Sequence, residues 1–168
     1  GGKDSGARGS FSMEKDVVLD ITKQVGHYLE KHLPEVKVIY TRTDDRFVKL
    51  YKRAEIANKN NADLFVSIHA NASPSHRAYG TETFVMGLHK TESNLKVAQK
   101  ENAVITMEED YTEHYEGYDP HSAESYIIFS LMQNAFLEQS LKAAELTQTE
   151  FRERARRKDR GVKQAGFL

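Results

Sequence analysis

The stretch DLFVSIHANA, residues 63–72, decides the fold class of this 168-residue chain. Its first six residues are almost continuously apolar, a pattern typical of a strand that is buried on both faces of a parallel sheet. His69 and a short polar loop follow where that strand is expected to end. We therefore expect the interior of a sheet in this stretch, and a functional loop at its carboxyl end.

The elements expected around this strand alternate between helix and strand. Apolar residues recur at helical spacing after Ser12, the expected N-cap, as far as Pro34. The other expected elements are, in chain order, a strand at 37–42, a helix at 48–60, a strand at 80–86, a helix at 93–105 and a helical stretch at 122–158 that breaks near Asn134. This order predicts an α/β fold, a single domain with a mostly parallel sheet flanked by helices.

The composition of the chain limits its domain size, its binding partners and the residues that could bind a metal. Hydrophobic residues make up 39% of the chain, enough for the core of one domain. The net charge of −1 gives no bulk attraction to nucleic acid, and no apolar run approaches the roughly 20 residues of a membrane span. We expect a monomer with neither a nucleic-acid partner nor a membrane span. The chain has no Cys, so any metal must be bound by His, Asp or Glu.

Charge is distributed unevenly along the chain. Residues 108–124 are rich in Asp and Glu and contain no Lys or Arg, whereas Lys and Arg crowd residues 152–163. The basic run would suit RNA, but Glu153 and Asp159 interrupt it and no aromatic stacking platform accompanies it beyond Phe151. We interpret it as a solvated helix face.

Glu14 is the first candidate for chemistry. On the predicted helix its angular position matches Val18, Ile21 and Val25, which form the apolar stripe, so its carboxylate is expected to face inward. A carboxylate that faces the core requires a cationic partner or a metal. The alternative is a carboxylate that only complements the helix dipole in the first turn, and the pattern leaves both interpretations open.

His69 is the second candidate. Ligands of open α/β sheets bind at the carboxyl ends of strands, and imidazole is a good zinc ligand. The alternative is a histidine with a purely structural hydrogen bond. The other six histidines lack recognisable metal spacing, and the chain contains no G-x-S-x-G, P-loop or GxGxxG motif.

Seven blocks of the sequence carry a family resemblance. In chain order they are GGKDSGA at 1–7, EKD at 14–16, TR at 41–42, RAEIAN at 53–58, ADLFVSIHANA at 62–72, GTE at 80–82 and RGVKQAGF at 160–167. Together they resemble the zinc-dependent N-acetylmuramoyl-L-alanine amidases of bacterial cell walls. The resemblance covers the chain except for residues 106–126, which look like a family-variable insertion.

The resemblance implies a single α/β domain with a mixed sheet between helices, and a Zn²⁺ ion held by a His, a Glu and a second His. Glu14 falls on the ligand Glu and His69 on the second ligand His. The family's first ligand His stands directly before the Gly-Gly found here at 1–2, and its catalytic Glu follows the block at 160–167. Both are therefore expected outside this sequence, which resembles the interior portion of the domain and lacks the family's first and last strands. Ser5 replaces a Pro often found at that position.

The resemblance also implies the reaction, hydrolysis of the amide between N-acetylmuramic acid and L-alanine in peptidoglycan. A catalytic zinc lowers the pKa of its bound water to about 7 and polarises the carbonyl, and the family Glu accepts the proton. This substrate places the protein in the cell envelope, periplasmic or secreted. The alternatives are an inactive amidase-like domain that binds peptidoglycan or a regulatory partner, and a different metal-dependent hydrolase on the same scaffold.

The insertion at 106–126 suggests regulation. Some related amidases resemble it in carrying a helical insert that blocks the zinc until an activator protein removes it. A tethered carboxylate reaches an effective concentration of about millimolar, and Glu108 and Glu109, with Glu101 behind them, are the candidates. The alternative is a solvated surface loop. For Asn71, beside His69, we expect a role in capping its own loop rather than a bond to substrate.

Overall fold

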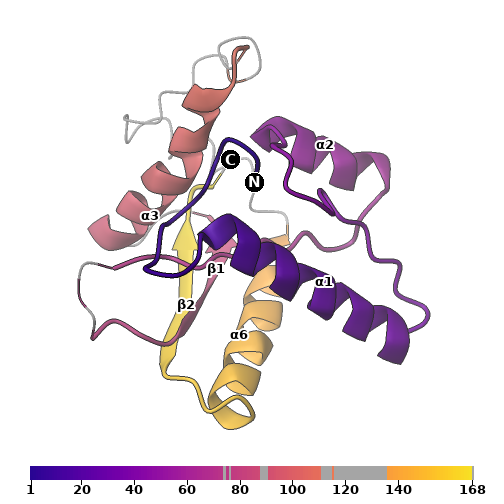
Figure 1. The fold of residues 1–168 in the computed structure, drawn as a ribbon. Helices are drawn as coiled ribbons and strands as arrows, with labels where there is room; N and C mark the ends of the chain where they lie inside the picture. Colours follow the sequence, from indigo (N-terminus) through magenta and orange to yellow (C-terminus); the bar gives the residue numbers. More distant parts are fainter. Residues whose placement is uncertain (74, 76, 88–90, 111–114, 116–135, 168) are drawn as a thin grey trace. The chain divides into compact units, whose positions relative to one another are not determined.

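The structure, a computed structural model, describes residues 1–73, 75, 77–87, 91–110, 115 and 136–167. The chain divides into two compact units, Gly1–Pro74 and Ser75–Leu168. The first unit contains α1 (Glu14–His32) and α2 (Leu50–Lys59), as Figure 1 shows. The second contains β1 (Thr81–Met86), α3 (Glu92–Asn102), a 3-10 helix (Ala103–Met107), α6 (Leu137–Glu153) and β2 (Asp159–Ala165).

Helix α1 begins one residue later than the sequence predicts. The N-cap is Met13 rather than Ser12, and no side chain caps the helix. The reason lies in the preceding loop, where the carbonyl oxygens of Ala7 and Ser5 accept hydrogen bonds from the N–H groups of Glu14 (2.8 Å) and Lys15 (3.3 Å). Backbone carbonyls thus satisfy donors that a capping side chain usually takes. The helix ends at His32, before Pro34, as expected.

The segment after α1 packs against the helix through Tyr40. Gly26, the buried residue of α1, lies under this side chain, and a Cβ at position 26 would overlap the Tyr40 hydroxyl and ring. A glycine in a helix interior costs stability relative to alanine. Here it gives room for the aromatic ring that joins the two segments.

Neither of the two strands expected in the first unit is present. Residues 37–42 and 63–68 carry no strand hydrogen bonding, and the latter are not buried on both faces, since Leu64 is 62% and Val66 66% exposed. Apolar sequence favours a strand only where a neighbouring strand supplies hydrogen-bond partners, because β structure is a property of a pair. No described residue in 1–73 belongs to an assigned strand.

The second unit contains a parallel pair of strands, β1 and β2, paired from Thr83↔Val162 to Met86↔Ala165. The sequence prediction extended the last helix to residue 158, but α6 ends at Glu153 and a strand follows. The register shifts between Thr81 and Thr83, where Gly161 with φ of +82° accommodates the irregularity. This charged strand was missed because its partner lies far away in sequence.

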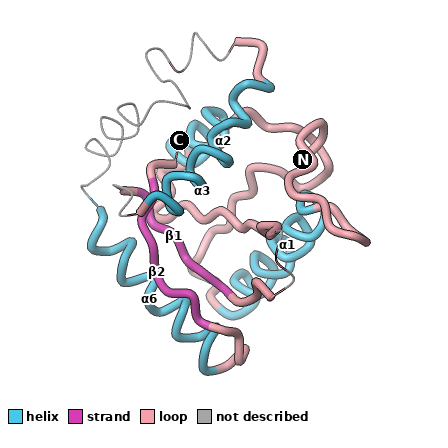
Figure 2. The backbone as a smooth tube through the Cα atoms, turned by 90° about the vertical axis from the view of Figure 1, so that its left-hand side faces the viewer, coloured by secondary structure: helices cyan, strands magenta, loops and turns pink. Residues whose placement is uncertain are grey.

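Helices flank this sheet, with α6 in contact with both strands and α3 with β2 (Figure 2). Buried apolar residues between them are Val85, Ala98, Ile105, Ala144 and Ala165. Side-chain amides satisfy the strand backbone: Asn94 Nδ2 donates to Gln164 O (3.1 Å) and Gln148 Nε2 to Thr81 O (3.0 Å). The predicted α/β class, with parallel strands flanked by helices, is confirmed. Among the described residues, no helix combines the length and apolarity needed to cross a membrane.

Candidate metal centre

Glu14 and His69 meet in the first unit, 55 residues apart in sequence. Glu14 Oε1 lies 3.2 Å from His69 Nδ1. The side chain of Glu14, at the start of α1, is 9% exposed, and that of His69 is 40% exposed. The inward orientation of Glu14 and its convergence with His69 are therefore confirmed, while their role as metal ligands stays a prediction.

Backbone amides fix the orientation of the Glu14 carboxylate. Ala7 N–H donates to Oε2 (2.8 Å), and Ala70 N–H donates to Oε1 (3.0 Å). Gly6, with φ of +62°, allows the loop to approach so closely, because a Cβ there would lie 2.6 Å from Oε2. Each carboxylate oxygen thus accepts one backbone N–H, the kind of contact that orients a carboxylate in a metal site.

These contacts also determine the charge of Glu14. Burial raises the pKa of its carboxyl group, but hydrogen bonds from His69, Ala7 and Ala70 outweigh burial and lower the pKa to about 2. Glu14 is therefore an anion at neutral pH. A half-buried anion beside an imidazole is a donor set suited to a divalent cation.

A second layer of contacts holds the glycine-rich loop against α1. Lys15 Nζ pairs with Asp45 Oδ2 (2.6 Å) and donates to Gly2 O (3.2 Å). Gly2 N–H donates to Asp45 Oδ1 (2.6 Å), and Arg42 donates to Lys15 O (2.7 Å). Sequence reasoning assigned no role to these residues. Lys15 and Arg42 belong to the blocks at 14–16 and 41–42 that carry the family resemblance. Their place in these blocks was the only feature of the sequence that pointed to a role near Glu14.

A pocket of about 150 Å³ adjoins Glu14. Small side chains and glycine form most of its walls: Ala7, Gly9, Ser12, Ala70, Asn71 and Ala72, with Val17. The side chain of Asn71 is exposed and makes no hydrogen bond with another described residue, so the expected loop cap is not observed there. Asn71 instead contributes to the wall of this pocket.

The distance between the Glu14 and His69 atoms suits a zinc ion, but the described residues include no third candidate ligand beside them. Two ligands at the usual distances from a tetrahedral zinc lie ~3.3 Å apart, close to the observed 3.2 Å between Oε1 and Nδ1. Within the described ranges, no cluster of three or more His, Cys, Asp or Glu is present. Glu14 and His69 are thus candidates for two of the three protein ligands that a catalytic zinc requires.

The other predicted site residues belong to the second unit. Glu108 is buried, 3% exposed, next to the 3-10 helix, Glu101 is half-buried near the end of α3, and Glu109 is exposed. Their regulatory role stays a prediction, and residues 111–114 and 116–126 of the insertion lie outside the described residues. His27 and His32 are exposed on α1, consistent with surface positions, while the remaining histidines, His76, His89, His114 and His121, are not described.

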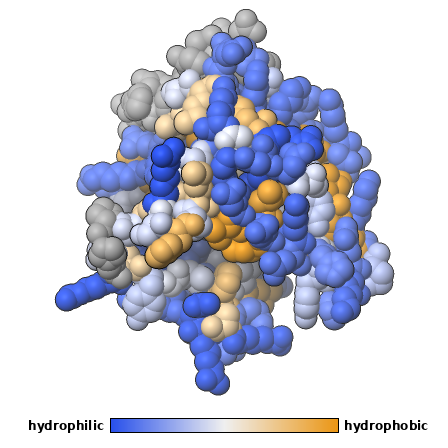
Figure 3. Space-filling model, viewed as in Figure 1, coloured by the Kyte–Doolittle hydropathy of each residue, from blue (hydrophilic) through white to orange (hydrophobic). Residues whose placement is uncertain are grey.

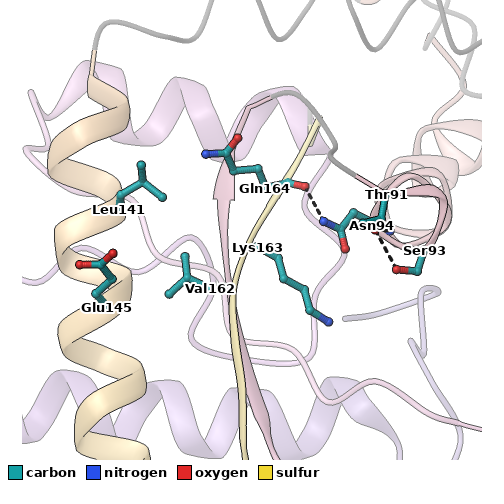
Figure 4. A pocket seen from close by; sticks show the side chains of 8 residues that line it. All are labelled: Thr91, Ser93, Asn94, Leu141, Glu145, Val162, Lys163 and Gln164. Atoms are coloured by element: carbon teal, nitrogen blue, oxygen red, sulfur yellow. Dashed lines mark hydrogen bonds between the residues drawn. The ribbon is translucent and has the colours of Figure 1, made fainter.

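A larger pocket of about 410 Å³ lies in the second unit between α6, β2 and the start of α3 (Figure 4). Thr91 caps α3 by accepting the N–H of Asn94, and Asn94 in turn bonds β2. None of the predicted site residues lines this pocket.

The elements and the pairing of the Glu14 carboxylate with the His69 imidazole define an α/β protein with a candidate metal centre. The model of the N-acetylmuramoyl-L-alanine amidase family matches residues 1–168. The chain belongs to this family, so the resemblance found in the sequence is confirmed.

Several known amidases are similar in sequence to this chain. The chain is 33% identical over 173 residues to N-acetylmuramoyl-L-alanine amidase AmiC of Escherichia coli O6:H1, covering 99% of this chain and 39% of that protein. It is 46% identical over 87 residues to AmiA of Salmonella typhimurium, covering 51% of this chain and 29% of that protein. The catalytic domain of CwlV, an amidase from Bacillus (Paenibacillus) polymyxa var. colistinus, is similar with 37% identity and a TM-score of 0.49 over 64% of this chain and 60% of that one. The chain thus spans well under half the length of these two curated relatives.

Proposed function

We propose that the protein containing this chain hydrolyses the amide bond between N-acetylmuramic acid and L-alanine in peptidoglycan, with one zinc ion bound by Glu14 and His69. The observation that carries this proposal is the 3.2 Å distance between Glu14 Oε1 and His69 Nδ1, the two residues for which the sequence resemblance implies a metal-ligand role. A cell-envelope location, periplasmic or secreted, follows from the substrate. Bound zinc supplies Lewis acidity toward the amide carbonyl and an acidified water.

Residues of this chain orient the Glu14 carboxylate and keep it charged. The Ala7 and Ala70 amides hold the Glu14 carboxylate in position, and its low pKa keeps it anionic without a metal. The small-residue pocket beside Glu14 leaves room for a compact group such as the methyl side chain of L-alanine.

Zinc binding and amide cleavage test the proposal in the full protein. Glu14→Gln and His69→Ala should each lower zinc affinity by roughly 100-fold or more and abolish release of L-alanine N-termini from purified peptidoglycan. The matched controls are Glu30→Gln and His27→Ala, exposed residues of the same helix, which should leave both measurements unchanged. Far-UV circular dichroism and melting temperature check that the variants are folded.

The outcomes separate the alternatives. Wild-type protein that binds zinc and peptidoglycan without releasing amino termini would favour the inactive binding domain. Cleavage of a different bond would favour another metal-dependent hydrolase. Zinc affinity equal in Glu14→Gln, His69→Ala and the two controls would show that the pair is not the metal centre.

A further inference from the structure

The turn between α6 and β2 presents cations that its neighbours do not neutralise. Arg156, Arg157 and Lys158 are consecutive and exposed. Within the described part of the chain, no carboxylate pairs with any of the three. The nearby arginines differ, because each has a carboxylate partner within 3.2 Å: Arg152 with Asp159 and Glu153, Arg154 with Glu150, and Arg160 with Glu82. The end of α6 is hydrophilic in the lower part of Figure 3.

An exposed aromatic ring adjoins these cations. Tyr79 is 68% exposed, and Lys158 Nζ lies 5.2 Å from its ring centroid. We define the basic turn as Arg156, Arg157, Lys158 and Tyr79. An aromatic face beside several cations is suited to a polymer that combines sugar rings with negative charges, since the ring packs on the apolar face of a sugar and the cations attract the anions.

Two backbone hydrogen bonds connect this turn to α6 and β1. Arg157 N–H donates to Phe151 O (2.9 Å), and Thr81 N–H donates to Lys158 O (2.9 Å). Arg156 has φ of +50°, in the left-handed region, where glycine is the usual residue after a helix. An arginine there costs free energy that a glycine would not, and an observed outlier of this kind points to a role for its side chain. Complementing the dipole of α6 does not account for Arg157 and Lys158, which lie beyond its last turn.

The number of cations discriminates between polyanions. Binding to anionic lipid uses clusters of roughly 4–8 Lys or Arg, and binding to duplex DNA commonly uses about 6–10 phosphate contacts. The basic turn has three. A weak contact of this size is effective where the same polymer is held elsewhere on the chain, because tethering raises its effective concentration.

We propose that the basic turn is a second binding surface for peptidoglycan, which attracts the free carboxylates of its stem peptides and packs Tyr79 on its sugars. This inference rests on the proposed function. It adds a surface in the second unit to the candidate metal centre of the first.

Sedimentation of the protein with purified, insoluble peptidoglycan tests the proposal. Replacing Arg156, Arg157 and Lys158 together by Ser should weaken binding about five- to tenfold at low salt, and the difference should vanish at high salt, because the contact is electrostatic. Tyr79→Ala should weaken binding at both salt concentrations. The matched control replaces Lys23, Lys31 and Lys37, three exposed cations of the first unit, by Ser and should bind like wild type.

A single variant separates binding from stability. Arg156→Gly removes one cation but relieves the left-handed strain, so it should raise the melting temperature while it weakens binding about twofold. A melting temperature that falls, with binding unchanged, would assign Arg156 a structural role and overturn the proposal.

Further outcomes would overturn the proposal that the basic turn binds peptidoglycan. Equal binding by the triple Ser variant and the control would overturn the proposal, as would a larger loss of affinity for a DNA duplex or for vesicles containing phosphatidylglycerol than for peptidoglycan. Cleavage of a small soluble muramoyl peptide should be unchanged in all of these variants. Failure of the wild-type protein to cleave that peptide would count against the proposed amidase function and would leave the binding comparison intact.

Discussion

At the scale of single residues, Gly6 determines how the Glu14 carboxylate is held. Its positive φ of +62° turns the loop so that Ala7 N–H points at Oε2, and its missing side chain leaves space for that oxygen. An L-residue in this conformation is strained, and a Cβ would lie 2.8 Å from the Cβ of Glu14. The glycine therefore serves the candidate ligand rather than the fold in general.

Gly6→Ala is expected to displace the Glu14 carboxylate and to lower zinc affinity about 10- to 100-fold, the usual effect of losing a supporting contact. Competition with a chromophoric chelator measures the affinity. Gly9→Ala is the matched control in the same loop, because its Cβ would come no closer than 3.3 Å to Ser12 O and its φ is not left-handed. If both variants bind zinc equally, Gly6 does not position Glu14.

At the scale of elements, charge pairs hold the two parallel strands together. Glu82 on β1 accepts from Arg160 (3.2 Å) and from Lys163, both on β2. Burial raises the pKa of Glu82, but the hydrogen bonds from Lys163 and Arg160 outweigh it and lower the pKa below its ordinary value. The basic run expected on a helix face is thus partly a strand whose charges are paired across the sheet.

The sign of this pKa shift predicts how stability depends on pH. A carboxyl group whose pKa is lowered by folding stabilises the protein above its unfolded pKa of about 4.3, and loses that contribution as pH falls through the folded pKa. Glu82→Gln should therefore destabilise by about 1 kcal/mol at neutral pH, discounted for partial exposure, with the difference from wild type shrinking below pH ~4.

Urea unfolding at several pH values measures this difference. Glu92→Gln on α3 is the matched control, since the Glu92–Lys96 pair is exposed and surface pairs contribute little. A Glu82→Gln difference that stays constant down to low pH would mean that the carboxylate charge is not what stabilises the sheet.

At the scale of the whole molecule, we propose that the insertion at 106–126 restrains activity. Its carboxylates are the regulatory candidates, and of these Glu109 is exposed whereas Glu108 is buried in the second unit. A carboxylate tethered near a zinc ion competes with substrate for the open coordination position.

Deleting residues 106–126 from the full protein should raise basal cleavage of peptidoglycan severalfold. Because the deletion removes the buried Glu108, the milder variants Glu101→Gln and Glu109→Gln are measured beside it, with Glu138→Gln on α6 as the control. Unchanged or lower activity in a folded deletion variant, together with no increase in the two Gln variants, would rule out autoinhibition.

The sequence by itself predicted the family, the α/β class, the helices α1, α2 and α3 to within a few residues, and the two candidate ligands. Each depends on local signals: helical spacing for α1, a carboxylate on its apolar stripe, and short blocks of residues such as the one that contains His69. Such signals survive in any tertiary context because they are set by the periodicity and chemistry of neighbouring residues.

The tertiary structure alone decided which extended segments form strands and what surrounds Glu14. The charged residues of β2 form a strand because β1 lies beside them, whereas the apolar residues 63–68 carry no strand hydrogen bonding. Likewise the Ala7 and Ala70 amides reach Glu14 from positions 7 and 56 residues away. Partners distant in sequence cannot be identified from local propensity, because hydrogen-bond pairing and backbone approach are properties of the folded chain.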